Sequence, residues 1–386
     1  LKELTGHSYR FSNCFSVSND PRVSLLSILT SIHPEKGNYL GGYRSYGLED
    51  KTVFSLLSEH GYKTGIFSDS DLAFSRFNDK SEYLIKYPTK NELLKAEVLI
   101  SHFLMPVIYN SRNMIKFFPE ALILDEYRDK TYLKGKITEL ISQKRKFMFL
   151  YTISDRKDCL PFPFYRTSRF ESEENAFLNY LNDEVNSIFD RLKARGKFDK
   201  TVICLFGLPE YSGSLKAADY KVPFILSHTG FEFERKVKND YSTLDILPSV
   251  LDAAGLGGLA KVSDGVSFFD PEFVRQDIIL TDVTGIRENK SVFFRNKEGY
   301  VSKDMCAERN EYPFIRRAVI RGDYKLNVLP GQEGVEYELY DISKDPEETD
   351  NIINSNMPLA RRMKNIYEDK LNKDFNFRMI NGYALK

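Results

Sequence analysis

The apolar run KFMFLYTIS at residues 146–154 is the feature that most constrains how this chain can fold. A strand that is apolar on both faces is typical of a parallel sheet covered by helices on each side. The segment at roughly 172–194 then carries apolar residues at helical spacing, and TVICLF predicts the next strand. This alternation of strands and helices predicts an α/β fold.

The N-terminal part of the chain continues the same alternation. YRFSNCFSVS predicts an extended segment, and RVSLLSILTSI predicts a short helix with its apolar residues nearly on one face. DKTVFSLLSEHG predicts another helix, closed by Gly61, and KTGIF predicts a strand. Residues 80–140 show only helical patches, such as NELLKAEVLISHF. The order of elements is therefore that of repeated βα units.

A Gly-rich break at 255–265 separates this part from a different pattern. Strands are predicted for DIILTDV, SVFFRN, AVIRGDYKLNVL and VEYELYDIS, followed by a terminal helix from about Pro358 to Leu371. A chain of 386 residues can hold one large domain with a smaller appended unit. We therefore predict an α/β core at 1–265 and a C-terminal subdomain at 266–386 with a small antiparallel sheet and a terminal helix.

The charge and apolar content of the chain do not favour nucleic acid or a membrane as a partner. Lys+Arg and Asp+Glu both number 55, so the net charge of zero gives no reason to expect nucleic acid or an anionic membrane as a partner. No apolar run approaches the ~20 residues of a membrane-spanning helix, and no signal peptide is visible. The four cysteines lack CxxC spacing and are expected to be buried thiols, with disulfides as the alternative; they are Cys14, Cys159, Cys204 and Cys306.

Four stretches of sequence carry a family resemblance. They are, in chain order, RVSLLSILTSIHP, EHGYKTGIF, KVPFILSHTGF with STLDILPSVLDAAGL, and RAVIRGDYKLNVLPGQEGVEYELYDISKDPEETDNI. The first resembles the helix after the nucleophile of the sulfatases, members of the alkaline-phosphatase superfamily. The last resembles their strand pair and ELYDL-x-x-DP-x-E-x-x-N turn. The resemblance covers nearly the whole chain and implies a mixed, mostly parallel sheet flanked by helices.

The family's chemistry is hydrolysis of sulfate or phosphate esters by in-line displacement. The resemblance implies a nucleophile at a helix N-terminus, where backbone N–H groups stabilise an anion. It also implies a divalent cation that activates the nucleophile, basic residues that hold the anion, and a His or Lys at the leaving group. Each of these groups can be sought in the sequence.

The nucleophile position falls on Ser18, and the arginine of the family motif C/S-x-P-x-R falls on Arg22. Asp20 replaces the motif's proline, and a carboxylate there would repel sulfate or phosphate. Serine before a helix is also common simply as a cap. Lys216 and Lys221 could still contact an anion, with solvated surface positions as the alternative. The candidate catalytic residues are Ser18, Arg22 and Lys216.

The family's metal-binding S-D-H-G falls on Phe206, Gly207, Leu208 and Pro209. A hard divalent cation needs oxygen donors, which Gly and Leu side chains do not have. The family's other Asp pair belongs to a first strand that would precede Leu1, so we expect that strand to be missing through an N-terminal truncation. No metal ligand and no cofactor are predicted for this chain.

Two further basic positions of the family are altered. Its G-K-W-H falls on Ser68–Asp71, and its H-x-P-Y falls on 159–162, where Cys159 replaces the histidine. No histidine of the chain falls on a catalytic position; the five are His7, His33, His60, His102 and His228. Asp20 together with Asp69 and Asp71 could form a new acidic metal site, with solvated loop carboxylates as the alternative. We expect Ser18, Gly207 and Asp69 to lie at one end of the main sheet.

Two functional interpretations follow. The first, which we favour, is a catalytically degenerate sulfatase-like protein that binds a glycan, a lipid headgroup or a protein partner. The second is an active, divergent metal-dependent sulfatase or phospho-transferase/hydrolase that uses Ser18 with Ca, Mg, Mn or Zn. The segment GIFSDSDLAFSRF is similar to divergent members without the GKWH pattern and so keeps the second interpretation open. The resemblance also favours an extracytoplasmic or membrane-anchored location.

Overall fold

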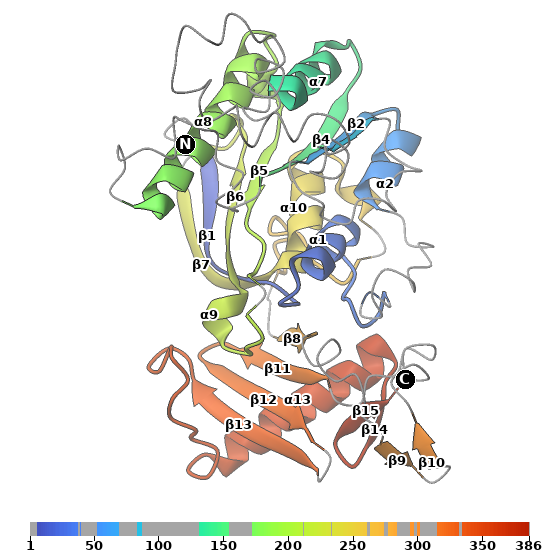
Figure 1. The fold of residues 1–386 in the computed structure, drawn as a ribbon, viewed down its shortest axis with the longest axis vertical. Coiled ribbons are helices and arrows are strands. Elements are labelled where there is room, and N and C mark those ends of the chain that lie inside the picture. Colours follow the sequence, from blue (N-terminus) through green and yellow to red (C-terminus); the bar gives the residue numbers. More distant parts are fainter. Residues whose placement is uncertain are drawn as a thin grey trace, which may run out of the picture. The chain divides into compact units, whose positions relative to one another are not determined.

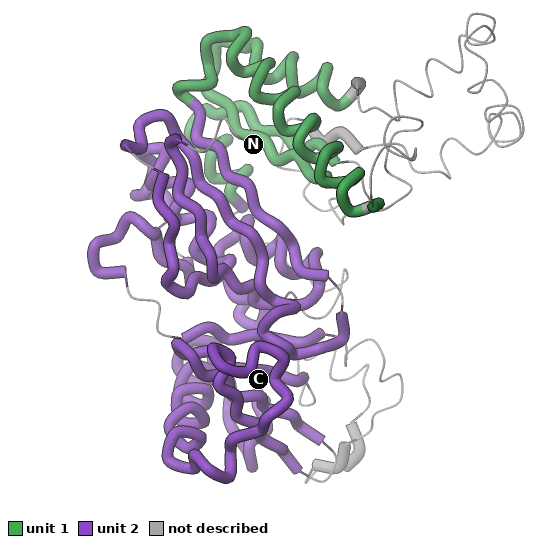
Figure 2. The backbone as a smooth tube through the Cα atoms, turned by 90° about the vertical axis from the view of Figure 1, so that its left-hand side faces the viewer, with its two compact units in different colours: residues 1–3, 53–200 green, residues 4–52, 201–386 purple. Residues whose placement is uncertain are grey.

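The fold was analysed in a computed structural model of the chain. It describes residues 6–37, 39, 52–68, 83–86, 131–153, 172–210, 212–232, 234–260, 263–273, 277–283, 294–296, 299–301, 315–331 and 334–385. The chain forms two compact units, residues 1–3 with 53–200 and residues 4–52 with 201–386 (Figure 2).

The first unit is built on a parallel sheet with strand order β3-β2-β4. Strands β2 and β4 of this sheet are labelled in Figure 1. Its strands are β2 (Lys63–Ser68), β3 (Tyr83–Lys86) and β4 (Phe147–Thr152). Its helices are α2 (Val53–Glu59), α7 (Thr131–Ser142), α8 (Glu173–Lys193) and the short 3-10 helix η6 (Phe198–Lys200). Apolar residues of α7 and α8 pack with Phe67 of β2 in one buried cluster. The strands predicted from KTGIF and KFMFLYTIS are confirmed.

The second unit begins with a four-stranded sheet of order β5-β6-β1-β7. Its strands are β1 (Ser8–Phe15), β5 (Ile203–Phe206), β6 (Lys221–Ser227) and β7 (Arg235–Ser242). Strand β6 runs antiparallel to both β1 and β5, whereas β7 is parallel to β1. The carboxyl ends of β1 and β5 therefore lie at the same end of the sheet, where β6 begins.

Short helices connect these strands and cover the sheet. They are α1 (Pro21–Thr30), α9 (Ala217–Tyr220), α10 (Ile246–Ala253) and the 3-10 helices η7 (Thr243–Asp245) and η8 (Gly257–Leu259). Ile28 of α1 and Ile246 of α10 pack in the same cluster as Phe11 of β1 and Phe224 of β6. The Phe11 and Phe224 rings stack with centroids 4.2 Å apart. Helix α1 is thus fixed on the sheet by its apolar face.

The C-terminal part of the second unit is an antiparallel sheet of order β13-β12-β11-β8. Its strands are β8 (Ile278–Asp282), β11 (Arg316–Arg321), β12 (Tyr324–Pro330) and β13 (Val335–Asp341). Helix α13 (Met357–Phe375) packs on this sheet through Met363, Tyr367 and Leu371 (Figure 1). Two short hairpins complete the described part: β9 (Phe294–Asn296) with β10 (Gly299–Val301), and β14 (Arg378–Ile380) with β15 (Tyr383–Leu385).

The predicted α/β fold is confirmed, with a parallel sheet, a mixed sheet and a C-terminal antiparallel sheet among the described residues. One buried apolar cluster joins Phe15, Leu215 and Tyr220 to Leu280 and Ala318 of the C-terminal sheet. That sheet therefore shares a core with segments that precede residue 265, and both belong to the same compact unit. The division into domains at 1–265 and 266–386 stays a prediction.

Candidate functional site

Ser18 lies three residues after the end of β1, in a loop held by its own side chains. The Ser16 hydroxyl donates to the Ser18 carbonyl at 2.7 Å and contacts the Ser24 hydroxyl of α1 at 2.8 Å. The Asp20 N–H donates to the Ser18 Oγ at 3.2 Å, and Ser18 is fully buried. The hydroxyl of Ser18, the predicted nucleophile, therefore already accepts a backbone hydrogen bond.

Asp20 is the residue that caps helix α1. Its Oδ1 accepts the N–H of Arg22 at 2.9 Å, as expected for an aspartate at an N-cap. The Arg22 guanidinium pairs with the same carboxylate, with Nε–Oδ1 at 3.2 Å and Nη2–Oδ2 at 3.0 Å. The positive end of α1 and the cation nearest to it thus both face a carboxylate of the chain itself.

Strand β8 holds this loop from the other side. Ser18 forms a parallel bridge with Thr281, whose N–H donates to the Val17 carbonyl at 3.0 Å. The Asn19 amide donates to Asp282 Oδ1 at 2.6 Å and accepts the Val283 N–H at 3.0 Å. Arg316 of β11 pairs with the other oxygen of Asp282. The C-terminal sheet therefore fixes the backbone on which Ser18 lies.

Gly207, on which the family's metal-binding position is expected to fall, directly follows β5. The Gly207 N–H donates to the Pro223 carbonyl at 2.9 Å, and a Cβ added at Gly207 would lie 2.7 Å from Pro223 Cδ. Leu208 packs against the apolar cluster of β1 and β6. Since this position offers no side-chain oxygen and no room for an aspartate, the cation of the family does not fit here.

Ser18 and Gly207 lie at the same end of the β5-β6-β1-β7 sheet, as expected, because each follows the carboxyl end of a strand antiparallel to β6. Asp69, Asp71 and Cys159 lie outside the described residues. Ser68 is buried and accepts a hydrogen bond from Thr152 at 2.7 Å. In the described part of the chain, no group of three His, Cys, Asp or Glu side chains is arranged to hold a metal ion.

Lys216 lies at the start of α9, with its ammonium 3.1 Å from Glu347. The loop around it is anchored by Glu348, which accepts the Ala217 N–H at 2.6 Å and pairs with Lys325 at 2.5 Å. The structure therefore brings Ser18 and Arg22 together at α1 and places the Lys216 ammonium against a carboxylate of the C-terminal turn. Lys221 is exposed at the first position of β6. The catalytic roles assigned to Ser18, Arg22 and Lys216 stay predictions.

A buried ion pair near this site was not expected from the sequence. The Arg317 guanidinium contacts both oxygens of Glu35 at 2.8–3.0 Å, and Thr281 donates to the same carboxylate at 2.8 Å. Burial alone would raise the pKa of Glu35, but the charge and hydrogen bonds of Arg317 outweigh it and hold the pKa below its usual value. Thr281 thus contacts both the Ser18 segment and this ion pair.

The histidines of the described residues bond to backbone groups. The Nδ1 atoms of His7 and His60 lie 2.6 Å from the Phe231 carbonyl and 2.8 Å from the Leu56 carbonyl. His228 Nδ1 accepts the Gly230 N–H at 3.1 Å. Burial lowers the pKa of His33 to about 4, and its Nε2 lies 3.3 Å from the Ile279 carbonyl. These contacts agree with structural roles; His102 lies outside the described residues.

No described helix is both long and apolar enough to span a membrane. A search of curated protein sequences finds no match. Among solved structures, the phosphonate monoester hydrolase SpPMH from Silicibacter pomeroyi is similar at 14% identity, with a TM-score of 0.66, over 100% of this chain and 93% of that one. Ps i-CgsB in complex with k-i-k-neocarrahexaose is similar at 15% identity, with a TM-score of 0.60, over 95% and 85%.

A third similar structure is the Bacteroides thetaiotaomicron protein BT33336S-sulf, described under the metabolism of multiple glycosaminoglycans. It is 12% identical, with a TM-score of 0.63, over 95% of this chain and 92% of that one. At these identities the likeness shows the fold, which is that of the alkaline-phosphatase superfamily. The family model named Sulfatase matches residues 1–256, about two thirds of the sequence. This chain belongs to the sulfatase family.

Proposed function

We propose that this chain is a sulfatase-family protein that has lost ester hydrolysis and retains the fold for binding. The observation that carries the proposal is the packing of Gly207 against Pro223 at the metal position. A Cβ there would lie 2.7 Å from the proline ring, and Leu208 beside it contributes to the apolar core. An enzyme of this family relies on the cation to neutralise ester oxygens, and this position supplies no ligand for it.

The start of α1 supports the same proposal. A sulfate or phosphate ester that approaches Ser18 would meet the Asp20 carboxylate, which already accepts the N–H of Arg22 in the first turn of the helix. It would also have to displace Asp20 from Arg22, at 3.0 Å. An anionic substrate is therefore disfavoured by charge repulsion and by the loss of existing hydrogen bonds.

The partner is proposed to be a glycan, with a lipid headgroup or a protein as the alternatives. One similar structure is a complex with neocarrahexaose, and another concerns glycosaminoglycan metabolism. Glycans are consequently the first partners to test. The balanced charge of the whole sequence, with 55 basic and 55 acidic residues, supports no nucleic-acid partner.

The second candidate is an active ester hydrolase or phospho-transferase that uses Ser18. It is favoured by one observation: Ser18 and Arg22 remain together at the N-terminus of a ten-residue helix. Such an enzyme would need Ca, Mg, Mn or Zn held by residues other than Gly207 and Leu208.

Metal analysis and turnover separate the two candidates. The purified protein is incubated with each of the four cations, desalted and analysed by mass spectrometry, and then assayed with nitrophenyl sulfate, phosphate and phenylphosphonate. We expect no stoichiometric cation and no turnover above buffer. A stoichiometric cation together with turnover would establish the second candidate and refute ours.

Two serine variants decide whether any observed turnover belongs to this chain. Ser18→Ala removes the proposed nucleophile, whereas Ser27→Ala makes the same change at a buried position nine residues further along, in α1. The active-enzyme candidate requires that Ser18→Ala abolishes turnover and that Ser27→Ala does not. Equal turnover in both variants would point to a contaminating enzyme.

A further inference from the structure

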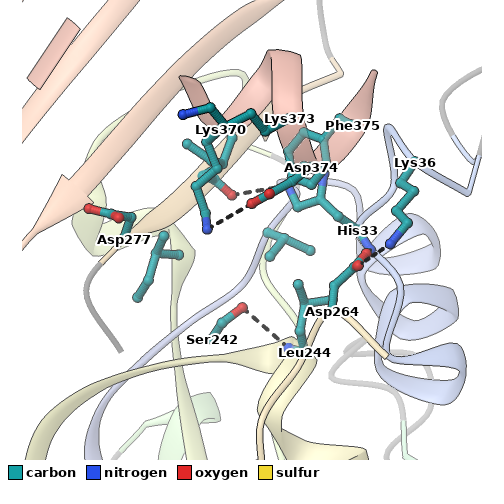
Figure 3. A pocket seen from close by; sticks show the side chains of 13 residues that line it. His33, Lys36, Ser242, Leu244, Asp264, Asp277, Lys370, Lys373, Asp374 and Phe375 are labelled. Atoms are coloured by element: carbon teal, nitrogen blue, oxygen red, sulfur yellow. Dashed lines mark hydrogen bonds and ion pairs between the residues drawn. The ribbon is translucent and has the colours of Figure 1, made fainter. Parts of the chain in front are cut away.

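A cavity of about 320 Å³ opens beside the loop that carries Ser18, and its lining includes neither Ser18 nor Arg22. Its lining combines an apolar floor with a charged rim (Figure 3). The apolar lining residues, here called the floor, are Val17, Leu244, Ile278 and Ile279, all at most 4% exposed. Ligand pockets typically measure ~300–1,000 Å³ and combine apolar walls with a few charged groups. The cavity therefore has the size of a small-molecule site.

One wall of the cavity is aromatic. The ring of His33 stacks on Phe375 at the end of α13, with centroids 4.2 Å apart and planes 14° apart. Both rings are at most 5% exposed, and burial keeps the imidazole uncharged at neutral pH. An apolar cavity of about 150 Å³ accommodates benzene, so this one has room for a ring with a short charged chain.

The lining includes three lysines and three aspartates, and the ammonium of one of the lysines, Lys373, points away from the other labelled side chains (Figure 3). Lys36 pairs with Asp264 at 2.5 Å, and Lys370 pairs with Asp374 at 3.1 Å on another wall (Figure 3). Asp264 is the more firmly fixed carboxylate, because its Oδ2 accepts the His33 N–H at 2.9 Å and its own N–H donates to the Ser31 carbonyl at 2.8 Å. The fixed rim therefore offers both an ammonium and a carboxylate.

We propose that this cavity binds a small zwitterion with an apolar ring, the chemistry of a free aromatic amino acid. Asp264 receives the ammonium of the ligand, Lys370 receives its carboxylate, and the ring lies on the apolar floor beside Phe375. A zwitterion can pair with both an aspartate and a lysine of the rim, whereas a ligand with a single charge can pair with only one of the two. The proposal goes beyond the proposed function and does not depend on whether esters are hydrolysed.

Three probes with the same ring test the charge requirement by isothermal titration calorimetry on the whole chain. L-Phenylalanine carries both charges, 3-phenylpropionate only the carboxylate, and 2-phenylethylamine only the ammonium. We expect phenylalanine to bind and each single-charge probe to bind about tenfold more weakly, as for the loss of one charged hydrogen-bonding partner. No binding of phenylalanine, or equal binding of either single-charge probe, would overturn the proposal.

Matched variants locate the site. Asp264→Asn and Lys370→Gln each remove one charge from the rim and are expected to weaken phenylalanine binding about tenfold. Lys373→Gln is the control, since the Lys373 ammonium points away from the other labelled side chains and pairs with Asp369 at 2.9 Å (Figure 3). Thermal melting shows that each variant is folded. Equal loss in Lys373→Gln, or unchanged binding in the other two, would refute the assignment.

A further variant distinguishes failure of the binding proposal from failure of the proposed function. Ser18→Ala is expected to bind phenylalanine as the unmodified chain does, because Ser18 is not among the residues that line the cavity. Loss of phenylalanine binding in this variant alone would show that the ligand lies at the Ser18 site and would contradict the proposal. Absence of ester turnover, by contrast, bears only on the proposed loss of catalysis.

Discussion

Burial lowers the pKa of His33 to about 4, so its imidazole is neutral at pH values at which an exposed histidine is charged. Glu35 and Asp264 act in the opposite direction, and Arg317 adds to the lowering. Between about pH 6.5 and pH 4, His33 is protonated in the unfolded chain but neutral in the folded chain. The free energy of unfolding therefore falls as the pH falls through this range. The shift corresponds to about 3 kcal/mol in the free energy of unfolding. We expect His33→Gln to lose this part of the pH dependence in urea titrations.

The matched control for this prediction is His60→Gln, at an exposed histidine in the other compact unit. It is expected to keep the pH dependence of the unmodified chain. The prediction fails if the free energy of unfolding falls as steeply between pH 6.5 and pH 4.5 in His33→Gln as in the unmodified chain.

At the scale of the element, α1 shows how one substitution changes both local structure and chemistry. Asp20 gives the helix an N-cap and at the same time occupies the end of the helix where the family binds an anion. We expect Asp20→Ala to destabilise the chain by about 1 kcal/mol through loss of the cap. Asp20→Asn should cost less, because asparagine caps equally well, and both are measured by urea unfolding. Equal losses in the two variants would mean that the ion pair with Arg22, and not the cap, is the stabilising contact.

At the scale of the whole molecule, the Glu35–Arg317 pair joins distant parts of the second unit. Glu35, in the turn after α1, contacts Arg317 of β11 and Thr281 of β8. The Arg317 guanidinium also lies 5.5 Å from the ring centroid of Phe377, which follows α13. Removing one partner leaves the other charge buried, so Arg317→Met is expected to cost about 3–5 kcal/mol. The double variant Glu35→Leu with Arg317→Met should cost less than the single change.

Unfolding of these variants is followed by circular dichroism, because the sequence contains no Trp. The difference in the free energy of unfolding between the single and double variants gives the cost of the buried unpaired charge, provided that both variants are folded in the absence of urea. A double variant less stable than Arg317→Met would show that the pair itself, and not the avoidance of a lone charge, stabilises the unit.

Much of the fold could be predicted from local sequence pattern. The apolar run at 146–154 became β4, and the terminal helix expected from Pro358 to Leu371 extends over Met357–Phe375. The candidate site was predicted less completely. The contact between Asn19 and Asp282 joins residues 263 positions apart, and that between Glu35 and Arg317 joins residues 282 positions apart. Apolar periodicity shows which face of an element is buried, but it does not show which polar groups will meet there.

The sequence by itself determined the family and the absence of side-chain oxygen donors at Gly207 and Leu208, because these depend only on residue identity and spacing. Only the tertiary structure decided that Gly207 packs against Pro223, that Asp20 faces both α1 and Arg22, and that a charged cavity opens beside His33. These features arise where separate elements converge. The free energy of a buried polar group depends on the partners that folding brings to it, and a single sequence does not encode those partners locally.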